Sequence, residues 1–452
     1  MLSVLRHRTY RHLFTAQVIA LTGTGLATVA LSLLAYDIAG ANASAVLGTA
    51  LAIKMLAYVG IAPVISAFAD RIPRRALLVS MDLVRAVVAL ALPLVTEVWQ
   101  VYVLIFLLQA ASAAFTPAFQ AALPDVLPEE RDYTRALSLS RLAYDLETLF
   151  SPALATALLS LASYDWLFAG TSAGFVASAA LVVSVLLPKP EPVERAGGVY
   201  AKAAFGTRLF LRTPRLRALL ALDLVVAAGG AMVIVNTVVL VRAGLGRSAG
   251  DVSLALGAYG AGSMAVALLL PRALDRVGDR TLMLPAAFVM TGVLAALSVG
   301  LVPATAGWSW PALLTAWTLL GATTSVILTP SGRLLRRSAT SADLPAAFAA
   351  RFSLSHGCWL LTYPLAGWLA AKAGPPVAAA ALTVVALAAA VAAVRIWPRV
   401  DPAELEHVHP ELPADHPHLT SAVEAGRRHT HEYRIDALHP QWPTPDRLRP
   451  VN

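Results

Sequence analysis

Long apolar stretches separated by short polar connections run through most of the chain. Each stretch has about the 20 residues that an α-helix needs to cross the hydrocarbon core of a bilayer. Backbone polar groups in hydrocarbon need internal partners, and the alternation typical of barrel strands is absent, so each stretch is predicted to be a helix. The predicted spans cover residues 13–36, 44–69, 76–95, 99–123, 139–162, 166–187, 216–241, 252–270, 281–303, 311–330, 345–370 and 376–397. The pattern predicts an all-α polytopic membrane protein with twelve transmembrane helices.

Composition supports a membrane protein and argues against a soluble enzyme. The 452 residues are 58% hydrophobic and 14% charged, whereas soluble proteins carry roughly 25% charged residues. So much apolar surface must face lipid. The formal net charge of +8 is therefore interpreted through membrane topology, and no nucleic-acid partner is expected. The one cysteine, Cys358, excludes an intramolecular disulfide and a multi-cysteine metal centre.

Basic residues concentrate on one side of the predicted membrane. The N-terminus and the connections on its side carry 23 Lys and Arg residues, whereas the opposite connections carry Arg242, Arg247 and Lys372. Cytoplasmic loops are enriched in Lys and Arg, so both termini are predicted to be cytoplasmic. An odd number of spans would break this alternation. We expect a multi-pass membrane protein.

The twelve spans divide into two halves. Residues 1–187 and 216–397 are each predicted to form a six-helix bundle, joined by a basic linker at 188–215 and followed by a His- and Pro-rich cytoplasmic tail at 398–452. An Asp-Arg pair follows the second span and another follows the eighth span, 205 residues later. Internal similarity at this distance indicates two pseudo-symmetric bundles.

The segment Ser66–Arg75 resembles the loop signature of the major facilitator superfamily, which reads Gly-x-Leu-Ala-Asp-Arg-x-Gly-Arg-Arg. Its charged residues match, whereas Ser66 and Pro73 replace the two glycines. The resemblance covers residues 1–397. It implies that the charged residues lock the two halves together on the cytoplasmic side, and the alternative is that the arginines only anchor the topology. The residues assigned to this gate are Asp70, Arg71, Arg74, Asp275 and Arg276.

Three further segments resemble one subgroup of that family. Leu5–Arg11 leads into the first span, Met81–Ala86 lies in the third and Ser151–Ala155 in the fifth. Together they are similar to bacterial exporters of the enterobactin, macrolide and nickel-resistance type. This resemblance implies a protein of the bacterial inner membrane. Transporters of this fold bind cargo near the midplane between the halves and rock the halves to alternate access.

Several ionisable residues lie inside predicted spans, where such residues are usually functional. Asp82 and Arg85 are three residues apart on one helix, so we expect a structural pair. Lys54 needs an acid from another helix. The candidates for a proton or substrate site are Asp145, Glu147, Asp223 and His356.

Each of these candidates has an alternative interpretation. Arg141 lies four residues before Asp145 and is a possible partner, while Glu147 lies deeper without a local base. Carboxylates near the cytoplasmic ends could be hydrated and inert. His356 shares a helical face with aromatic residues, so packing is its alternative role. That face consists of Phe352, His356, Trp359 and Tyr363.

The tail holds seven of the ten histidines. In an extended chain, alternate side chains share a face, so each His-x-His pair can present two imidazoles to one ion. His-rich tracts are typical of metal binding, and the alternative is a solvated tail. Tyr433 and Trp442 indicate that the last part of the C-terminal tail docks on the membrane domain. The candidate metal ligands are His407, His409, His416, His418, His429 and His431.

The chain contains no nucleotide-binding loop, so an ion gradient, most simply of protons, is expected to drive transport. The first hypothesis is a proton-coupled exporter of a divalent metal, nickel or cobalt. The alternatives are an exporter of an amphipathic organic molecule, such as a drug or siderophore, and a membrane metal sensor. We expect a monomer without a cofactor, whose partners are the cargo, protons and the bilayer.

Overall fold

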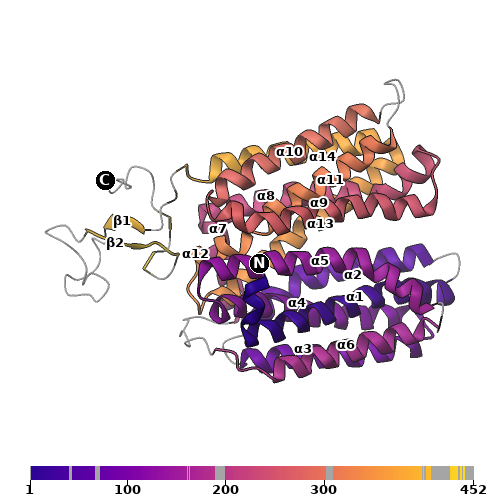
Figure 1. The fold of residues 1–452 in the computed structure, drawn as a ribbon, viewed down its shortest axis with the longest axis horizontal. Helices are drawn as coiled ribbons and strands as arrows, with labels where there is room; N and C mark the ends of the chain where they lie inside the picture. The colour runs from indigo at the N-terminus through magenta and orange to yellow at the C-terminus, as the bar shows by residue number, and fades with distance from the viewer. Residues whose placement is uncertain are drawn as a thin grey trace.

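The computed structural model describes residues 2–39, 43–66, 72–159, 161, 163–188, 199–301, 309–399, 401, 404–408, 428–435, 438–439 and 441–442. Its long helices form two bundles that lie side by side (Figure 1). The N bundle consists of α1 (Arg8–Ala39), α2 (Ala43–Ser66), α3 (Arg74–Ala91), α4 (Val98–Val126), α5 (Glu130–Leu159) and α6 (Asp165–Val183). The C bundle consists of α8 (Pro214–Val238), α9 (Ala249–Leu274), α10 (Asp279–Gly300), α11 (Trp310–Leu328), α13 (Leu344–Ala373) and α14 (Pro375–Ile396).

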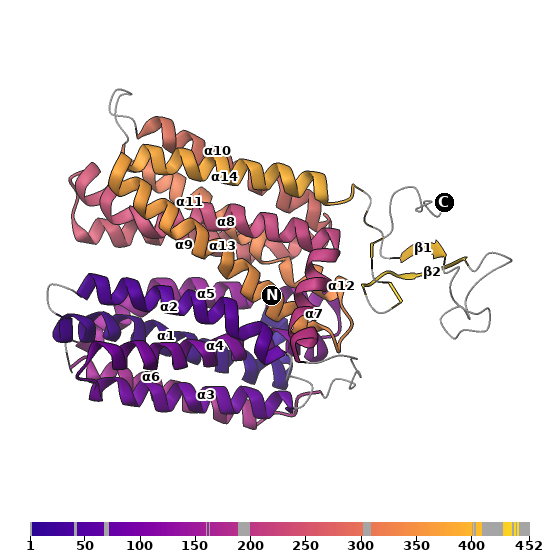
Figure 2. The same ribbon diagram turned by 180° about the vertical axis from the view of Figure 1, so that it is seen from behind.

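Shorter elements complete the described chain. They are η1 (Leu2–Arg6), η3 (Leu92–Leu94), α7 (Val199–Arg212), η4 (Val239–Gly244), α12 (Ser331–Ser338) and the strands β1 (Glu404–Val408) and β2 (Arg428–Glu432). The strands pair antiparallel. The short helices α7 and α12 and the strands lie at one end of the bundles, which we call the tail end (Figures 1 and 2).

The twelve predicted spans correspond to the twelve long helices. Among the described residues, nine helices are long and apolar enough to cross a membrane by composition alone. Helix α2 is apolar as well, but its fully described stretch is the shorter Ala52–Ile65. The exceptions are α5 and α13, which pack between the bundles: α13 against α2, and α5 against α9. Because these helices face protein as well as lipid, they can carry polar side chains.

The sequence missed three features of the fold. Helix α5 starts at Glu130, before the predicted position, and the acidic residues Glu130 and Asp132 in its first turn suit the positive end of the helix dipole. The linker contains α7, which packs against α13 so closely that a Cβ on Gly206 would lie 2.2 Å from the carbonyl oxygen of Ala346. The tail contains a hairpin.

Glycines allow α9 and α11 to touch backbone to backbone. A Cβ on Gly321 would lie 1.8 Å from the carbonyl oxygen of Tyr259, and one on Gly262 would lie 2.1 Å from that of Thr318. Small residues are the usual means by which helices approach closely in membranes.

We therefore predict that Gly321→Ala destabilises the protein by about 1–3 kcal/mol, the usual range for overpacking. Gly292→Ala is the matched control, because Gly292 is an exposed helical glycine with open space around it. Thermal unfolding of both variants in detergent, followed by tryptophan fluorescence, measures the difference. Equal melting temperatures for the two variants would contradict the close helix contact.

Candidate transport site and gate

Arg74 connects the two bundles at the tail end. It begins α3, and its buried guanidinium binds the carboxylate of Asp125 in α4. The same group donates to the carbonyl oxygen of Ser341 in the C bundle at 3.4 Å. Arg74 thus contacts both bundles, and its gate role stays a prediction. The other predicted gate residues of this segment, Asp70 and Arg71, lie outside the described residues.

The short helix α12 supplies contacts between the bundles that the sequence did not reveal. Arg333 lies 2.6 Å from Glu130 of the N bundle and 3.5 Å from Asp279 of the C bundle. Arg336 donates to the carbonyl oxygen of Pro128 and lies over the ring of Tyr133, with 5.5 Å to the ring centroid. In the sequence these arginines only indicated topology, because nothing local reveals partners about 200 residues away.

The second Asp-Arg pair makes a weaker contact between the bundles. Asp275 lies 3.6 Å from Arg131, and both side chains are exposed. Exposed ion pairs usually contribute about 0–1 kcal/mol. Arg276 is exposed beside it. The contact between the bundles at the tail end therefore depends more on Arg74 and α12 than on this pair.

Further from the tail end, α5 and α9 are joined by a polar contact. Arg141 lies 2.6 Å from Asp145 on the same helix, and its Nε donates to Ser263 of α9 at 3.1 Å. The predicted pairing of Asp145 with Arg141 thus occurs, within the interface between the bundles. Glu147 is half-buried and lies close to Gly25 of α1 within the N bundle.

An aromatic cluster spans the interface between α2 and α13. The Tyr58 ring lies 4.8 Å from that of Phe352 and 4.6 Å from that of His356, between centroids. The Tyr58 hydroxyl donates to Gln109 at 2.8 Å. His356 is therefore at the junction of the bundles, and its Nδ1 contacts the carbonyl oxygen of Phe352 at 2.7 Å.

The predicted aromatic face of α13 divides between two neighbours. Phe352 and His356 face the N bundle, whereas Trp359 packs against Gly230 of α8, within the C bundle. The expected acid partner of Lys54 is not seen among the described residues. The described partner of Lys54 is the Tyr58 ring, 5.6 Å from Nζ to the centroid, and no carboxylate in the described part of the chain pairs with it.

Two buried ion pairs lie inside single bundles. Arg85 binds Asp82 as predicted and is held between the rings of Phe115 and Phe175, while Ser178 donates to Asp82 at 2.8 Å. This enclosure fits a structural pair.

The other pair joins two helices of the C bundle. Arg351 lies 3.6 Å from Asp223, whose side chain is 2% exposed and makes no hydrogen bond in the described structure. Arg351 is one of the 23 basic residues that the sequence analysis assigned to the cytoplasmic connections. That assignment was wrong, because Arg351 lies inside α13.

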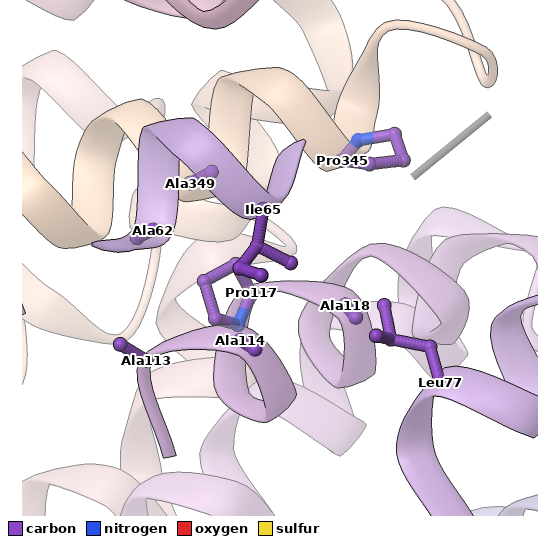
Figure 3. Close-up of a pocket in the computed structure, with 9 residues that line it drawn as sticks. All are labelled: Ala62, Ile65, Leu77, Ala113, Ala114, Pro117, Ala118, Pro345 and Ala349. Carbon is purple, nitrogen blue, oxygen red and sulfur yellow. The ribbon is translucent and has the colours of Figure 1, made fainter. Parts of the chain in front are cut away.

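A small apolar pocket lies where α2, α3 and α4 meet α13 near the tail end (Figure 3). No charged side chain lines it, so it offers nothing to orient a polar cargo. Its lining residues are Ala62, Ile65, Leu77, Ala113, Ala114, Pro117, Ala118, Pro345 and Ala349. The pocket is a packing gap in the closed seam between the bundles.

The predicted metal ligands are only partly described. The register of the hairpin pairs His407 with His429 and Leu405 with His431. His409, His416 and His418 lie outside the described residues. In the described part of the chain, no three His, Cys, Asp or Glu side chains come together as a metal site.

The sequence was compared with known proteins. The family model of the Major Facilitator Superfamily matches residues 13–241 and again residues 219–430. An uncharacterized MFS-type transporter, YfiS of Bacillus subtilis, is 29% identical over 142 residues, which is 31% of this chain and 33% of the relative. Macrolide efflux protein A of Enterococcus faecalis is 28% identical over 153 residues, which is 32% of this chain and 47% of the relative. The chain thus matches less than half the length of these relatives.

Solved structures share the fold at low sequence identity. The human organic anion transporter MFSD10 aligns with a TM-score of 0.72 and 12% identity, over 85% of this chain and 99% of that one. The transporter FucP, solved in the outward conformation, aligns with a TM-score of 0.64 and 14% identity, over 86% of this chain and 98% of that one. With the repeated family match and the multi-pass helical fold, this chain belongs to the major facilitator superfamily.

Proposed function

We propose that the chain exports an amphipathic organic molecule by alternating access between the bundles. The observation that carries this proposal is the aromatic cluster of Tyr58, Phe352 and His356, which both bundles build. Aromatic rings bind large apolar surfaces, and the Tyr58 hydroxyl and Lys54 add polar groups at the edge. Relatives named macrolide efflux proteins support an organic cargo.

The tail end is, in this proposal, the cytoplasmic end. It carries most of the Lys and Arg residues of the connections, which favours the cytoplasm. Because Arg74, Arg333 and Arg336 join the bundles there, the described conformation is closed toward the cytoplasm. Opening the cytoplasmic side requires these contacts to break and compensating contacts to form elsewhere.

This orientation predicts that a reporter fused after Asn452 and one inserted at residue 195 are active only as cytoplasmic reporters. A reporter inserted at residue 305 should behave as external. Paired phosphatase and fluorescent-protein fusions at each position measure whether the reporter is external or cytoplasmic. An external C-terminus would overturn the orientation and the assignment of the closed side together.

The metal hypothesis has less support. The described residues contain no three-ligand site, and the pairing of His407 with His429 is the observation that favours metal contact. A membrane sensor would share that hairpin without moving cargo. Transport measurements separate the three alternatives, because only an exporter accumulates its cargo in inside-out vesicles.

The organic-cargo proposal predicts that Tyr58→Ala weakens the apparent affinity for a macrolide about thirtyfold, since truncating an aromatic anchor typically costs about 2 kcal/mol or more. Phe106→Ala is the control, because Phe106 is exposed on α4. Uptake of radiolabelled erythromycin and of nickel-63 into inside-out vesicles is compared. Nickel uptake without macrolide uptake would support the metal hypothesis, and no uptake of either would favour a sensor.

We also propose that Asp223 and Arg351 couple cargo movement to protons. A buried carboxylate is stable either as an anion beside its cation or as a neutral acid. Protonation of Asp223 would release Arg351, and Arg351 lies two residues from Ser353, which donates across the interface to the carbonyl oxygen of Val59. Helix α13 thus joins the pair to the seam. The other ionisable groups near the pair are Tyr133, His356 and Cys358.

Asp223→Asn should abolish the stimulation of uptake by a pH gradient, because asparagine cannot exchange a proton, while counterflow of unlabelled and labelled cargo continues. Asp165→Asn is the control, since Asp165 is an exposed acid in the first turn of α6. Uptake and counterflow are measured in the same proteoliposomes at a series of imposed gradients. If a pH gradient stimulates uptake by Asp223→Asn as strongly as uptake by the unmodified protein, this pair is not the coupling site.

A further inference from the structure

The C-terminal tail returns to the membrane domain and binds it through a buried charge. Asp401 lies 3.3 Å from Arg215 at the start of α8 and 3.7 Å from Arg337 at the end of α12. Arg337 also donates to the backbone carbonyl of Asp401 at 3.0 Å. The Arg215 side chain is 3% exposed, so it depends on the tail for its counter-charge.

A small folded unit continues from Asp401. Leu405, Tyr433 and Ile435 are buried together, with Trp442 packed against them. Trp442 also lies under Arg215, with 5.0 Å from the guanidinium carbon to the ring centroid. The Tyr433 hydroxyl donates to the carbonyl oxygen of Gln441 at 2.7 Å. The tail therefore contacts Arg215 through an ion pair and through a ring, from two separate segments.

The helix that receives the tail is the helix that closes the gate. Arg337 of α12 faces Asp401, whereas Arg333 and Arg336 of the same helix contact Glu130 and the carbonyl of Pro128 in the N bundle. Because α12 spans only eight residues, these contacts cannot move independently. A chain of charges thus runs from the tail through α12 to the N bundle.

We propose that the docked tail braces the closed cytoplasmic gate by neutralising Arg215 and Arg337. These two arginines are close enough to repel each other, and Asp401 lies between them. Without the carboxylate, the repulsion pushes α12 away from α8 and loosens Arg333 and Arg336 from the N bundle. This inference rests on the proposed alternating access, since a brace matters only if the gate opens.

The test measures gate opening without any cargo. Spin labels are placed on exposed positions at the tail ends of the two bundles, Glu129→Cys and Arg272→Cys, in a Cys358→Ala background. Pulsed electron paramagnetic resonance of the full chain in nanodiscs gives the distance distribution. We expect Asp401→Asn to raise the long-distance population about tenfold, which is measurable when the open minor state is a few per cent populated. Trp442→Ala should raise it in the same direction.

Two comparison variants make the result decisive. Glu404→Gln removes an exposed acid of the same hairpin and should leave the distances unchanged, while Arg333→Ala breaks the gate directly and should lengthen them. Unchanged distances in both Asp401→Asn and Trp442→Ala, beside longer distances in Arg333→Ala, would overturn the brace. Unchanged distances in Arg333→Ala would overturn it as well. If macrolide uptake fails but Asp401→Asn and Trp442→Ala lengthen the spin-label distances, the brace is supported and only the proposed cargo is wrong.

Discussion

Arginine side chains that cross from one bundle to the other hold this structure in its closed form. Two bundles that each fill their own core have little reason to stay together, because lipid is as apolar as their surfaces. Arg74, Arg333 and Arg336 supply the attraction by reaching carboxylates and backbone carbonyls of the opposite half. Such contacts are directional and breakable, which suits a seam that must open.

The interface between the bundles changes in character with distance from the tail end. Charged contacts lie at the tail end, the apolar pocket and the aromatic cluster follow, and Arg141 with Ser263 joins α5 to α9. Charges near the membrane surface retain contact with water, whereas deeper charges need partners within the protein. An amphipathic cargo fits the aromatic region, where apolar surface and a few polar groups occur together.

The tail gives the gate a second point of control. Its hairpin carries His407 opposite His429, and the ring of His431 packs against that of His439 at 5.1 Å between centroids. Any ligand that rearranges this hairpin would also disturb Trp442, which packs on the hairpin and lies against Arg215. In that arrangement, histidines in the tail would influence transport without contacting the cargo.

The sequence by itself determined the membrane class, the twelve helices, the two halves, the basic side and the family. Each of these depends on local features: apolar length, loop charge and a short motif. The local pairs Asp82–Arg85 and Arg141–Asp145 were also predictable, because residues three or four apart share a helix face. The strongest candidate residues of the loop signature, Asp70 and Arg71, lie outside the described structure.

Only the tertiary structure decided which distant residues meet. It brought Arg351 to Asp223, Tyr58 to His356, Arg333 to Glu130 and Asp401 to Arg215. Apolar periodicity tells which face of a helix avoids water, but not which neighbour that face contacts. The rotation and depth of each helix come from packing against all the others. The gate, the aromatic site and the docking of the tail are therefore properties of the assembled bundles.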